Sequence, residues 1–408
     1  MKFSAPRGTK DILPEEIAIW QKIEEKARQI FALFNYHEIR TPIFEATDLF
    51  VRSIGDGTDI VSKEMYTFLD KSERSITLRP EETAPVVRAA IEHNLLSLDR
   101  ITKLYYMGPM FRYERPQAGR YRQFNQIGVE AFGAEDALLD VEVMILAHAF
   151  FKGLGLEDLV LNLNSVGCKK DQAAYKEKIK HHLKENLSKL CDNCQNRWHK
   201  NPLRVLDCKE EKCQKLIDSA PKSTDFLCQK CNHHLNQVQA GLKQANIDYK
   251  LNHRLVRGLD YYTGTAFEII SEKLGAQNAV CGGGRYDDLV QELGGKSIPA
   301  IGFAIGIERL VEVLKAGKVS FDYLQKIELF IAWIGEEAKQ KAFEILKSSR
   351  EKGVCAEIDY LGKSLKAQMK LADKLKAKEV LIIGEEELKK GKAILKNMQT
   401  GEQKEIDL

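Results

Sequence analysis

Three short stretches of the chain combine arginine, an acid or an amide, and glycine in a pattern typical of strands. They are residues 111–130, 255–269 and 300–310. Glycine lets a ligand approach the backbone, arginine meets phosphate with a planar fork, and carboxylates bind amines or azoles. These residue types suit an open sheet that holds a triphosphate and a small zwitterion. The sequence has neither a P-loop nor a dinucleotide-binding fingerprint, so we expect a phosphate site built from arginines.

The composition is that of an ordinary globular protein. The chain has 408 residues, of which 44% are hydrophobic and 30% charged, and we expect two or three domains. The formal net charge of +3 is too small to indicate a nucleic-acid partner by itself. The N-terminal residues lack the apolar core of a signal peptide, and no run reaches membrane-spanning length. We therefore expect a cytoplasmic enzyme with no membrane partner.

The order of apolar and polar residues divides the chain. A helix is expected to begin at Pro14, because proline and the acids Glu15 and Glu16 favour a first helical turn. Residues 168–245 are rich in lysine and cysteine, helical in period and short of strands, which indicates an inserted helical segment. After a break at 319–326, residues 327–408 show the strand–helix alternation of a small α/β domain with a partly parallel sheet.

The segment QFNQIGVE is expected to form a strand with one polar face. Alternation places Asn125, Ile127 and Val129 on one face. The other face carries Phe124, Gln126, Gly128 and Glu130, and its row of Gln, Gly and Glu makes it polar. This face would make a floor for a polar ligand. A solvent-exposed sheet face is the alternative, since such faces are common in antiparallel sheets.

The preceding segment favours the ligand-binding interpretation. YYMGPMFRYERP reads as the partner strand of a long antiparallel hairpin that turns at 116–119. The hairpin would bring Arg112 near Gln126, where a guanidinium could neutralise charge that develops on a phosphate. The alternative for Arg112 is a surface salt bridge with Glu114.

Two further arginines lie in the other glycine-containing segments. Arg309 is expected in the first turn of a helix after Gly306, and a helix N-terminus with an arginine favours an anion. Arg257 precedes a strand that we expect to include Tyr261 and Tyr262, which would then point to opposite faces, one structural and one lining the site.

Taken together, these segments resemble those of histidyl-tRNA synthetases, a family of class II aminoacyl-tRNA synthetases. The likeness covers nearly the whole chain, and RGLDYYTGTAFE is its most specific part. The matching segments, in the family's order, are RGTKDILP, LRPEETAPVVRA, the motif 2 stretch at 111–130, LVRGLDYYTGTAFEI, GGGRYDDL and the motif 3 stretch GFAIGIERL. The resemblance implies an α+β catalytic domain with a mostly antiparallel sheet over 1–167 and 246–320. It also implies that 168–245 is an insertion and that 327–408 is an anticodon-binding α/β domain.

The resemblance also implies a role for each residue of the expected site. Those that would hold histidine are Glu81, Thr83, Gln126, Glu130, Tyr261 and Tyr262. Those that would hold ATP are Arg112, Glu114, Arg120 and Arg309, with Mg²⁺ bridging the distal phosphates. Arg112, Arg257 and Arg309 would be catalytic, because they would stabilise charge on the phosphates. Arg115 and Gln117 would reach the acceptor end of the tRNA. The sequence departs from the family pattern at Glu82, where glycine is usual, and at Asn125, where histidine is common.

The implied reaction joins L-histidine to ATP, forms histidyl-adenylate, and transfers histidine to the 3′ end of tRNA(His) with release of AMP and pyrophosphate. A homodimer is expected by analogy. One alternative is a histidine-binding regulatory paralogue in histidine biosynthesis, and another is an RNA-binding protein with a relic catalytic fold. The intact Arg112, Arg257 and Arg309 favour the enzyme.

Six of the nine cysteines crowd into residues 191–231. In a reducing compartment, clustered thiols favour metal over disulfides. Cys191-x-x-Cys194 and Cys228-x-x-Cys231 have the spacing of two zinc knuckles, and Cys208 and Cys213 between them are alternative ligands. We expect one structural Zn²⁺. Reduced buried thiols are the alternative, and Cys168, Cys281 and Cys355 read as ordinary core residues.

Lysines are spaced to form one stripe near residues 363–374. Lys363, Lys366, Lys370 and Lys374 recur at intervals that place them on one helical face. Such a stripe is usually a solvated face. In the anticodon-binding domain that the resemblance implies, contact with tRNA phosphates is the better interpretation.

Overall fold

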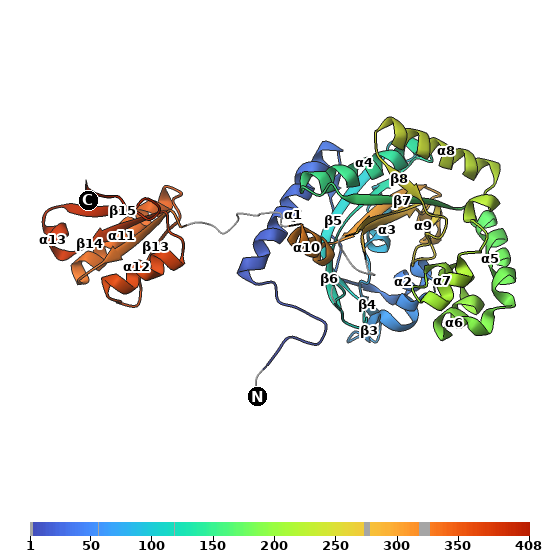
Figure 1. Cartoon of the computed structure of the whole chain (residues 1–408), viewed down its shortest axis with the longest axis horizontal. Helices are drawn as coiled ribbons and strands as arrows, with labels where there is room; N and C mark the ends of the chain where they lie inside the picture. Colours follow the sequence, from blue (N-terminus) through green and yellow to red (C-terminus); the bar gives the residue numbers. More distant parts are fainter. Residues whose placement is uncertain (1–2, 56, 118, 273–277, 318–326) are drawn as a thin grey trace. The chain divides into compact units, whose positions relative to one another are not determined.

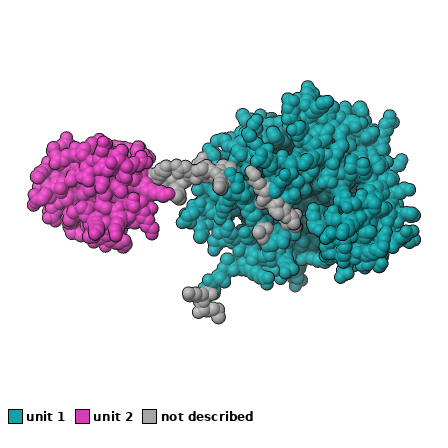
Figure 2. Space-filling view, viewed as in Figure 1, with its two compact units in different colours: residues 1–320 teal, residues 321–408 magenta. Residues whose placement is uncertain are grey.

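The computed structural model describes residues 3–55, 57–117, 119–272, 278–317 and 327–408. It divides into two compact units, residues 1–320 and 321–408, which Figure 2 colours separately. The segment 319–326, where we expected a break, lies outside the described residues. Among the described residues, no helix has the length and apolar character needed to cross a membrane.

Eight strands of the described residues form the main sheet of the first unit, in the order β1-β5-β6-β11-β10-β9-β7-β8. They are β1 (His37–Glu38), β5 (Thr102–Phe111), β6 (Gln123–Phe132), β7 (Leu159–Gly167), β8 (Tyr249–Leu251), β9 (Thr263–Ser271), β10 (Ala279–Arg285) and β11 (Ala300–Gly306). The edge pairs β1–β5 and β7–β8 are parallel, whereas the five inner pairs are antiparallel. The expected mostly antiparallel sheet is confirmed.

The expected antiparallel hairpin formed by YYMGPMFRYERP and QFNQIGVE is also confirmed. Strands β5 and β6 pair along their whole length, with Gly108 opposite Gln126 and Met110 opposite Phe124. The backbone of Gln117 pairs with that of Arg120 just before the return strand. The expected turn at 116–119 includes residue 118, which lies outside the described residues.

Helices cover both faces of the main sheet (Figure 1). In this unit they are α1 (Pro14–Leu33), α2 (Thr47–Ile54), α3 (Thr83–Glu92), α4 (Ala137–Gly153), α9 (Leu289–Glu292) and α10 (Ile307–Ala316), with a π-helical turn η1 (Ile60–Glu64). As expected, Pro14 begins α1. Phe31 of α1 packs on Tyr105 of β5 and Phe303 of β11, and also contacts Phe150 of α4. These aromatic contacts fix α1 and α4 against the sheet.

A separate cluster of buried apolar side chains joins α3 and α9 to β5 and β6. Its members include Val86, Val87, Tyr106, Phe132, Leu289 and Val290. A small three-stranded sheet, β2-β4-β3, precedes α3. Its strands are β2 (Phe44–Ala46), β3 (Tyr66–Leu69) and β4 (Ser75–Leu78). The residues between β4 and α3 are therefore held between two sheets and a packed helix.

The insertion between β7 and β8 is helical, as expected, and its helices lie together at one side of the unit in Figure 1. They are α5 (Lys169–Lys184), α6 (Asp192–Lys200), α7 (Glu211–Ile217) and α8 (Gln229–Gln244), with 3₁₀ turns η2 (Leu187–Lys189), η3 (Pro202–Asp207) and η4 (Ser223–Phe226). The insertion has its own core, in which apolar side chains pack around Cys194 and Cys213.

The second unit is a small α/β domain, as expected. Its sheet has the order β13-β12-β14-β15-β16, with the first three strands parallel and the last two antiparallel. The elements are β12 (Leu329–Trp333), α11 (Glu336–Glu351), β13 (Ala356–Ile358), α12 (Leu365–Lys374), β14 (Glu379–Ile383), α13 (Glu385–Lys389), β15 (Lys392–Asn397) and β16 (Gln403–Asp407). The mixed order follows from the helical crossovers between the parallel strands and the short turns between the others.

Candidate active site

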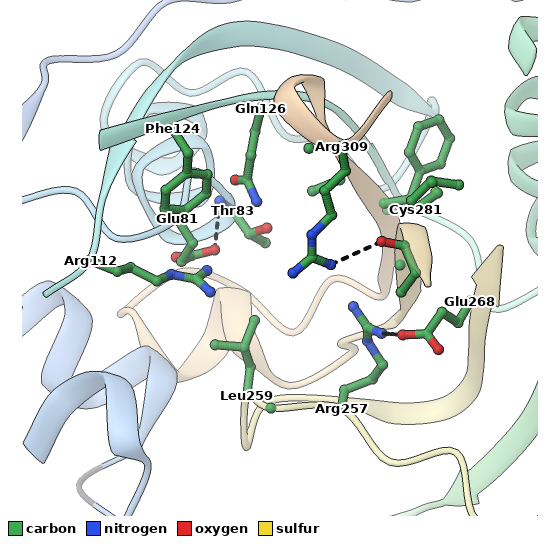
Figure 3. A pocket seen from close by; sticks show the side chains of 18 of the residues that line it. Glu81, Thr83, Arg112, Phe124, Gln126, Arg257, Leu259, Glu268, Cys281 and Arg309 are labelled. Carbon is green, nitrogen blue, oxygen red and sulfur yellow. Dashed lines mark hydrogen bonds and ion pairs between the residues drawn. The ribbon is translucent and has the colours of Figure 1, made fainter. Parts of the chain in front are cut away.

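One cavity of about 240 Å³ in the first unit gathers the three arginines from the three glycine-containing segments. Arg112 follows β5, Arg309 lies in the first turn of α10, and Arg257 precedes β9. Figure 3 shows their side chains entering this space, which we call the central cavity, from different sides. Segments far apart in the sequence thus place three guanidinium groups around one volume.

Arg112 is held along its stem. Its Nε donates to the carbonyl of Pro80 at 2.8 Å, and its guanidinium lies 5.3 Å from the centre of the Phe124 ring. The Glu114 carboxylate is 4.0 Å from Nη1, so the alternative salt bridge is at most a loose contact. The backbone bond through Nε leaves the terminal nitrogens of Arg112 directed into the central cavity (Figure 3).

Arg309 is also fixed by backbone carbonyls. Its Nη1 donates to the carbonyl of Ala279 at 2.9 Å, and its Nε donates to that of Gly119 at 3.4 Å. Burial and the nearby guanidinium of Arg120 lower the pKa of Arg309 below its ordinary value. Cations that repel one another in a buried site are stabilised by an anion placed between them.

Arg257 is paired with a carboxylate from the neighbouring strand. Its Nη1 lies 3.0 Å from Glu268, and its guanidinium lies 5.9 Å from the centre of the Tyr262 ring. Burial opposes the charge, but Tyr262 and Glu268 raise the pKa of Arg257 above its ordinary value. Gly282 leaves room for this guanidinium, because a Cβ on residue 282 would lie 1.9 Å from Nη2 and Arg257 would have to shift.

The start of α3 contributes acid and hydroxyl groups at the other side of the central cavity. Glu81 is 3% exposed, and its carboxylate accepts the N–H groups of Thr83 and Ala84 at 2.9 and 3.0 Å. Burial raises the pKa of Glu81, although those N–H bonds oppose the rise. The Tyr261 hydroxyl lies 3.4 Å from the same carboxylate. Glu81 therefore stabilises the helix start and faces the cavity at once.

Glu130 is the most deeply buried acid of the site. It is 1% exposed, and Thr83 donates its hydroxyl to Oε1 at 2.8 Å, while the Tyr286 hydroxyl bonds to Oε2. Burial raises the pKa of Glu130 to about 8, against the effect of those two hydrogen bonds. Gly302 on the adjacent strand makes room for it, since a Cβ there would lie 2.0 Å from Oε2.

Gln126 has an unused acceptor. Its Oε1 is buried and has no hydrogen-bond partner among the described residues, and its side chain lines the central cavity. Phe124, Gln126 and Glu130 all line this cavity, whereas Ile127 and Val129 are fully buried away from it. The alternation expected for β6 is therefore seen. A buried acceptor without a partner favours a ligand that carries a donor.

The expected opposite orientation of Tyr261 and Tyr262 is wrong. Both side chains line the central cavity, with ring centres 4.9 Å apart. Strand β9 begins only at Thr263, so the two tyrosines lie in a turn where the period-2 alternation of a strand does not apply. Both can therefore contribute to the site.

The other motif 2 residues divide between the cavity and the surface. Glu114 and Arg120 line the central cavity and form an ion pair of 2.9 Å. Arg115 and Gln117 are exposed and do not line it. They lie on the loop of the hairpin, so the structure does not bring them together with Arg112, Arg257 and Arg309.

Both departures from the family pattern have a clear place. Glu82 is buried and directed to Arg79 at 2.8 Å and to the Thr41 hydroxyl at 2.7 Å. Burial raises the pKa of Glu82 to about 7, against the attraction of Arg79. Asn125 donates its backbone N–H to Glu308 at 2.8 Å. Neither residue lines the central cavity.

Glu268 and Cys281 are among the residues of the central cavity to which the sequence analysis assigned no role in the site. Glu268 lies within the quoted segment 255–269, and it is a lone acid in a strand of buried apolar residues. That contrast is the signal that could have identified it. Cys281, expected in the core, is buried but also lines the cavity. No sequence signal distinguishes it from an ordinary core cysteine.

Seven of the nine cysteines lie in two clusters, and the expected combination of the two knuckles is wrong. Cys191 and Cys194 lie with Cys208 and Cys213, the residues named as alternatives. Cys228 and Cys231 lie instead with Cys168 and Asp171. In each cluster the ligand atoms are within 4.8 Å of one another. Sequence spacing identifies a knuckle but not its partner, because the fold decides which helix starts meet.

The lysine stripe of the second unit is exposed. Lys366, Lys370 and Lys374 lie on α12, and Lys363 precedes it; all four are solvent-exposed. Buried Gln368 fixes this helix to the sheet, since its amide bonds both backbone groups of Trp333. The stripe is therefore a cationic face on a well-anchored helix.

Comparison with known proteins agrees with this arrangement. Residues 8–310 match the family model of Histidyl-tRNA synthetase, and residues 328–408 match the Anticodon binding domain model. The chain is 54% identical over 408 residues to the histidine--tRNA ligase of Halothermothrix orenii. The match covers all of this chain and 97% of that relative. The chain belongs to the histidyl-tRNA synthetase family. The resemblance seen in the motifs is confirmed.

Solved structures support the same conclusion for the fold. The apo histidyl-tRNA synthetase of S. aureus has a TM-score of 0.83 and 42% identity, covering 100% of this chain and 97% of that one. A Bacillus halodurans protein described as an ATP phosphoribosyltransferase regulatory subunit/histidyl-tRNA synthetase has a TM-score of 0.68 and 21% identity, covering 94% and 99%. At that identity the second likeness concerns the fold alone, so the regulatory alternative has less support than the histidyl-tRNA synthetase assignment.

Proposed function

We propose that this chain is a histidine--tRNA ligase, which activates L-histidine with ATP and transfers it to tRNA(His). The observation that carries the proposal is the central cavity itself. Arg112, Arg257 and Arg309 enter it from different sides, and the polar side chains of Glu81, Thr83, Gln126 and Glu130 line it with them. The guanidinium groups suit a triphosphate, and the buried polar groups suit a zwitterion with an azole ring.

The amino-acid end of the cavity supplies the groups that histidine needs. Glu81, Thr83 and the free Oε1 of Gln126 would hold the α-ammonium group, because each offers an oxygen acceptor. Glu130 and the tyrosines would contact the imidazole. A site that bonds both ring nitrogens rejects amino acids without them by about 10⁴ or more, so no editing domain is needed.

The nucleotide end supplies charge stabilisation. The histidine carboxylate oxygen attacks the α-phosphorus of ATP, a new P–O bond forms, and pyrophosphate leaves with the electrons of the broken bond. Arg112 and Arg257 would neutralise charge on the α-phosphoryl oxygens, and Arg309 would hold the γ-phosphate. The arginines are held by carbonyls, a carboxylate and rings, so little reorganisation is needed at the moment of reaction.

The cavity also fits Mg²⁺ as the partner of ATP. The carboxylates of Glu114 and Glu268 line it, and Mg²⁺ prefers such oxygen ligands together with phosphates. When bound, the ion neutralises charge on the distal phosphates and on the departing pyrophosphate. The protein's own contribution remains the positioning of the triphosphate by the three arginines.

Contact with tRNA is assigned to surfaces outside the cavity. Exposed Arg115 and Gln117 on the hairpin loop would reach the acceptor end, where a ribose hydroxyl attacks the adenylate and releases AMP. Residues 327–408 would bind the anticodon region, with the α12 lysines on its phosphates. Residues 1–167 and 246–320 form the catalytic core in this scheme, and 168–245 is the insertion.

A structural Zn²⁺ is assigned to the first cysteine cluster. Cys191, Cys194, Cys208 and Cys213 are buried, and Sγ of Cys191 lies 3.9 Å from Sγ of Cys208. Four thiolates around one zinc ion are a common structural site, and tetrahedral geometry places its sulfurs about 3.8 Å apart. The cluster is the centre of the insertion's apolar core, so the ion would hold this small core together. Reduced thiols of this kind suit the cytoplasm.

A homodimer completes the proposal. The small sheet leaves apolar side chains exposed that a partner subunit would cover, since Phe44, Phe68 and Leu69 are 53%, 47% and 65% exposed. Light scattering with size-exclusion chromatography should give twice the chain mass. A monomer at micromolar concentration would refute this part alone.

The experiment for the main proposal is aminoacylation. Purified protein, ATP, Mg²⁺ and labelled L-histidine are incubated with a tRNA(His) transcript or with a non-cognate tRNA transcript as control. Label should become acid-precipitable only with tRNA(His). Histidine binding without any charging would favour the regulatory paralogue, and tRNA binding without histidine binding would favour a relic RNA-binding protein.

A further inference from the structure

The second cysteine cluster is a site that the mechanism above does not use. Cys168, Asp171, Cys228 and Cys231 place one ligand atom each within 4.8 Å of all the others. We propose that this cluster is a second zinc site, with three thiolates and one carboxylate, separate from the Cys191 site. It would tie the two ends of the insertion together.

The same local structure brings both pairs of ligands into place. Cys168 is the N-cap of α5 and Asp171 its third residue, while Cys228 is the N-cap of α8 and Cys231 its third residue. Cys191 and Cys194 have the same relation at the start of α6. The sequence C-x-x-D at 168–171 is therefore a knuckle in which a carboxylate replaces the second thiolate. Asp is an accepted zinc ligand.

Two helix N-termini thus meet at the cluster. Helix N-termini stabilise negative charge through their N–H groups and dipoles, so they suit the thiolates that a bound Zn²⁺ requires. The N–H of Cys168 donates to Asp171 at 3.3 Å, and the N–H of Asp171 donates back to the Cys168 sulfur. Zn²⁺ would replace the three thiol protons, which pass to solvent without any change of oxidation state.

A plain helix cap is the alternative interpretation of Asp171. A cap needs only the N–H groups of its own helix, which here belong to α5. The Asp171 carboxylate also has the sulfurs of Cys228 and Cys231, at the start of α8, within 4.8 Å of one of its oxygens. Three cysteine sulfurs converge on one buried carboxylate across two helices. A ligand set explains this convergence, and capping does not.

The cluster lies where the chain enters and leaves the insertion, so a bound metal would hold the two ends of the insertion together. Cys168 directly follows β7, where the chain enters the insertion, and α8 leads the chain back to β8. An ion bound there closes a loop of roughly 60 residues and limits the freedom of the insertion. Helix α8 also contacts the rest of the unit without metal. His234 lies 2.8 Å from buried Asp140, and Lys230 forms an exposed ion pair of 2.6 Å with Glu135.

The residue that follows Asp171 in the sequence contacts a turn that lines the central cavity. Gln172, next to Asp171, donates Nε2 to the backbone carbonyl of Tyr262 at 2.9 Å and to that of Gly167 at 3.2 Å. Tyr262 lines the central cavity. A metal that fixes the start of α5 would therefore position the Tyr262 turn. This consequence rests on the proposed function, whereas the metal site itself does not.

Metal analysis tests the site directly. The full chain is purified under reducing conditions, Zn²⁺ is supplied and excess is removed, and zinc per chain is measured by mass spectrometry. We expect two ions in the wild type and one in Cys228→Ser/Cys231→Ser. Cys208→Ser/Cys213→Ser should also hold one, and Cys355→Ser, a matched control outside both clusters, should hold two. The proposal would be overturned if the wild type held one ion and Cys228→Ser/Cys231→Ser still held one. A Cys228–Cys231 disulfide in freshly purified protein would also overturn it.

A gain of ligand keeps the test independent of folding losses. Asp171→Cys turns C-x-x-D into C-x-x-C, and in the Cys208→Ser/Cys213→Ser background the single site should bind Co²⁺ with four thiolates in place of three. The sulfur-to-cobalt charge-transfer band should become stronger by about one third, in proportion to the thiolate count. An unchanged spectrum would exclude residue 171 as a ligand. The KM for histidine should rise in Cys228→Ser/Cys231→Ser. An unchanged KM, with two ions in the wild type and one in the variant, would refute only the coupling to the Tyr262 turn.

Discussion

The guanidinium of Arg257 lies against the backbone of Gly282, so closely that a Cβ on residue 282 would be 1.9 Å from Nη2. In the sheet, Gly282 is paired with Glu268, whose carboxylate holds Nη1 of the same arginine at 3.0 Å. The missing side chain of one strand and the acid of the next thus define where the guanidinium of Arg257 lies. A glycine far from Arg257 in sequence determines its position.

Gly282→Ala should displace Arg257 while its charge remains in the protein. Because stabilisation of developing charge depends on position, we expect the rate of ATP–pyrophosphate exchange to fall by about 10²–10³. Gly57→Ala is the matched control, since a Cβ at residue 57 meets no atom within 4 Å. A normal exchange rate in folded Gly282→Ala protein would show that the close approach has no catalytic meaning.

Arg257→Ala should separate catalysis from binding. Exchange should fall by about 10³, because charge on the α-phosphoryl group is no longer neutralised, whereas histidine affinity measured by calorimetry should largely survive. Arg257→Lys keeps the charge but loses the planar fork, so its exchange rate should lie between those of the wild type and Arg257→Ala. Equal losses of exchange and of histidine affinity would contradict a role in the transition state.

Glu130 should make the stability of the free protein depend on pH. Its pKa is raised from 4.5 to about 8 by burial, so between these values the folded state keeps a proton that the unfolded state releases. Stability therefore falls as the pH rises from about 4.5 to about 8, at roughly 1.4 kcal/mol per pH unit at most, and then levels off.

Glu130→Gln removes this contribution and isolates it from Glu81 and Glu82, whose pKa values are also raised. The melting temperature of the first unit, wild type minus variant, should decline across that pH range. Exposed Glu157→Gln serves as the control, with no such decline. A wild-type-minus-Glu130→Gln difference that stays constant from pH 5 to pH 9 would mean that Glu130 is ionised throughout.

Charge reversal on α12 should weaken tRNA binding alone. Lys366→Glu/Lys370→Glu should raise the KM for tRNA, and the slope of log affinity against log salt should become shallower by about 1 for each lost phosphate contact. Exchange of pyrophosphate, which needs no tRNA, should be unchanged. Lys347→Glu on α11, also exposed, is the control. Unaltered tRNA affinity in the double variant would show that the lysine stripe is an ordinary solvated face without tRNA contact.

The comparison of sequence and structure shows which kinds of inference succeed. Alternation along β6 correctly placed Gln126 and Glu130 on one face, because a period of two holds within a strand. The same rule failed at Tyr261 and Tyr262, because β9 begins one residue later. Local rules are valid inside an element and fail at its ends, where boundaries are hardest to predict.

The sequence also could not predict which residues far apart in the chain contact one another. The two C-x-x-C knuckles were recognisable, but which helix starts meet is a property of packing, and Cys168 and Asp171 carry no paired-cysteine signal. The contact of Arg257 with Gly282 likewise depends on the register of β9 and β10. Neither spacing nor composition encodes such long-range pairing.

The central claim is that the cavity formed by Arg112, Arg257 and Arg309 activates one amino acid. The most direct measurement is ATP–pyrophosphate exchange by the purified protein with each of the twenty amino acids in turn. Exchange that depends on L-histidine alone is the predicted result. Exchange that requires a different amino acid, or no exchange with any of them, would contradict it.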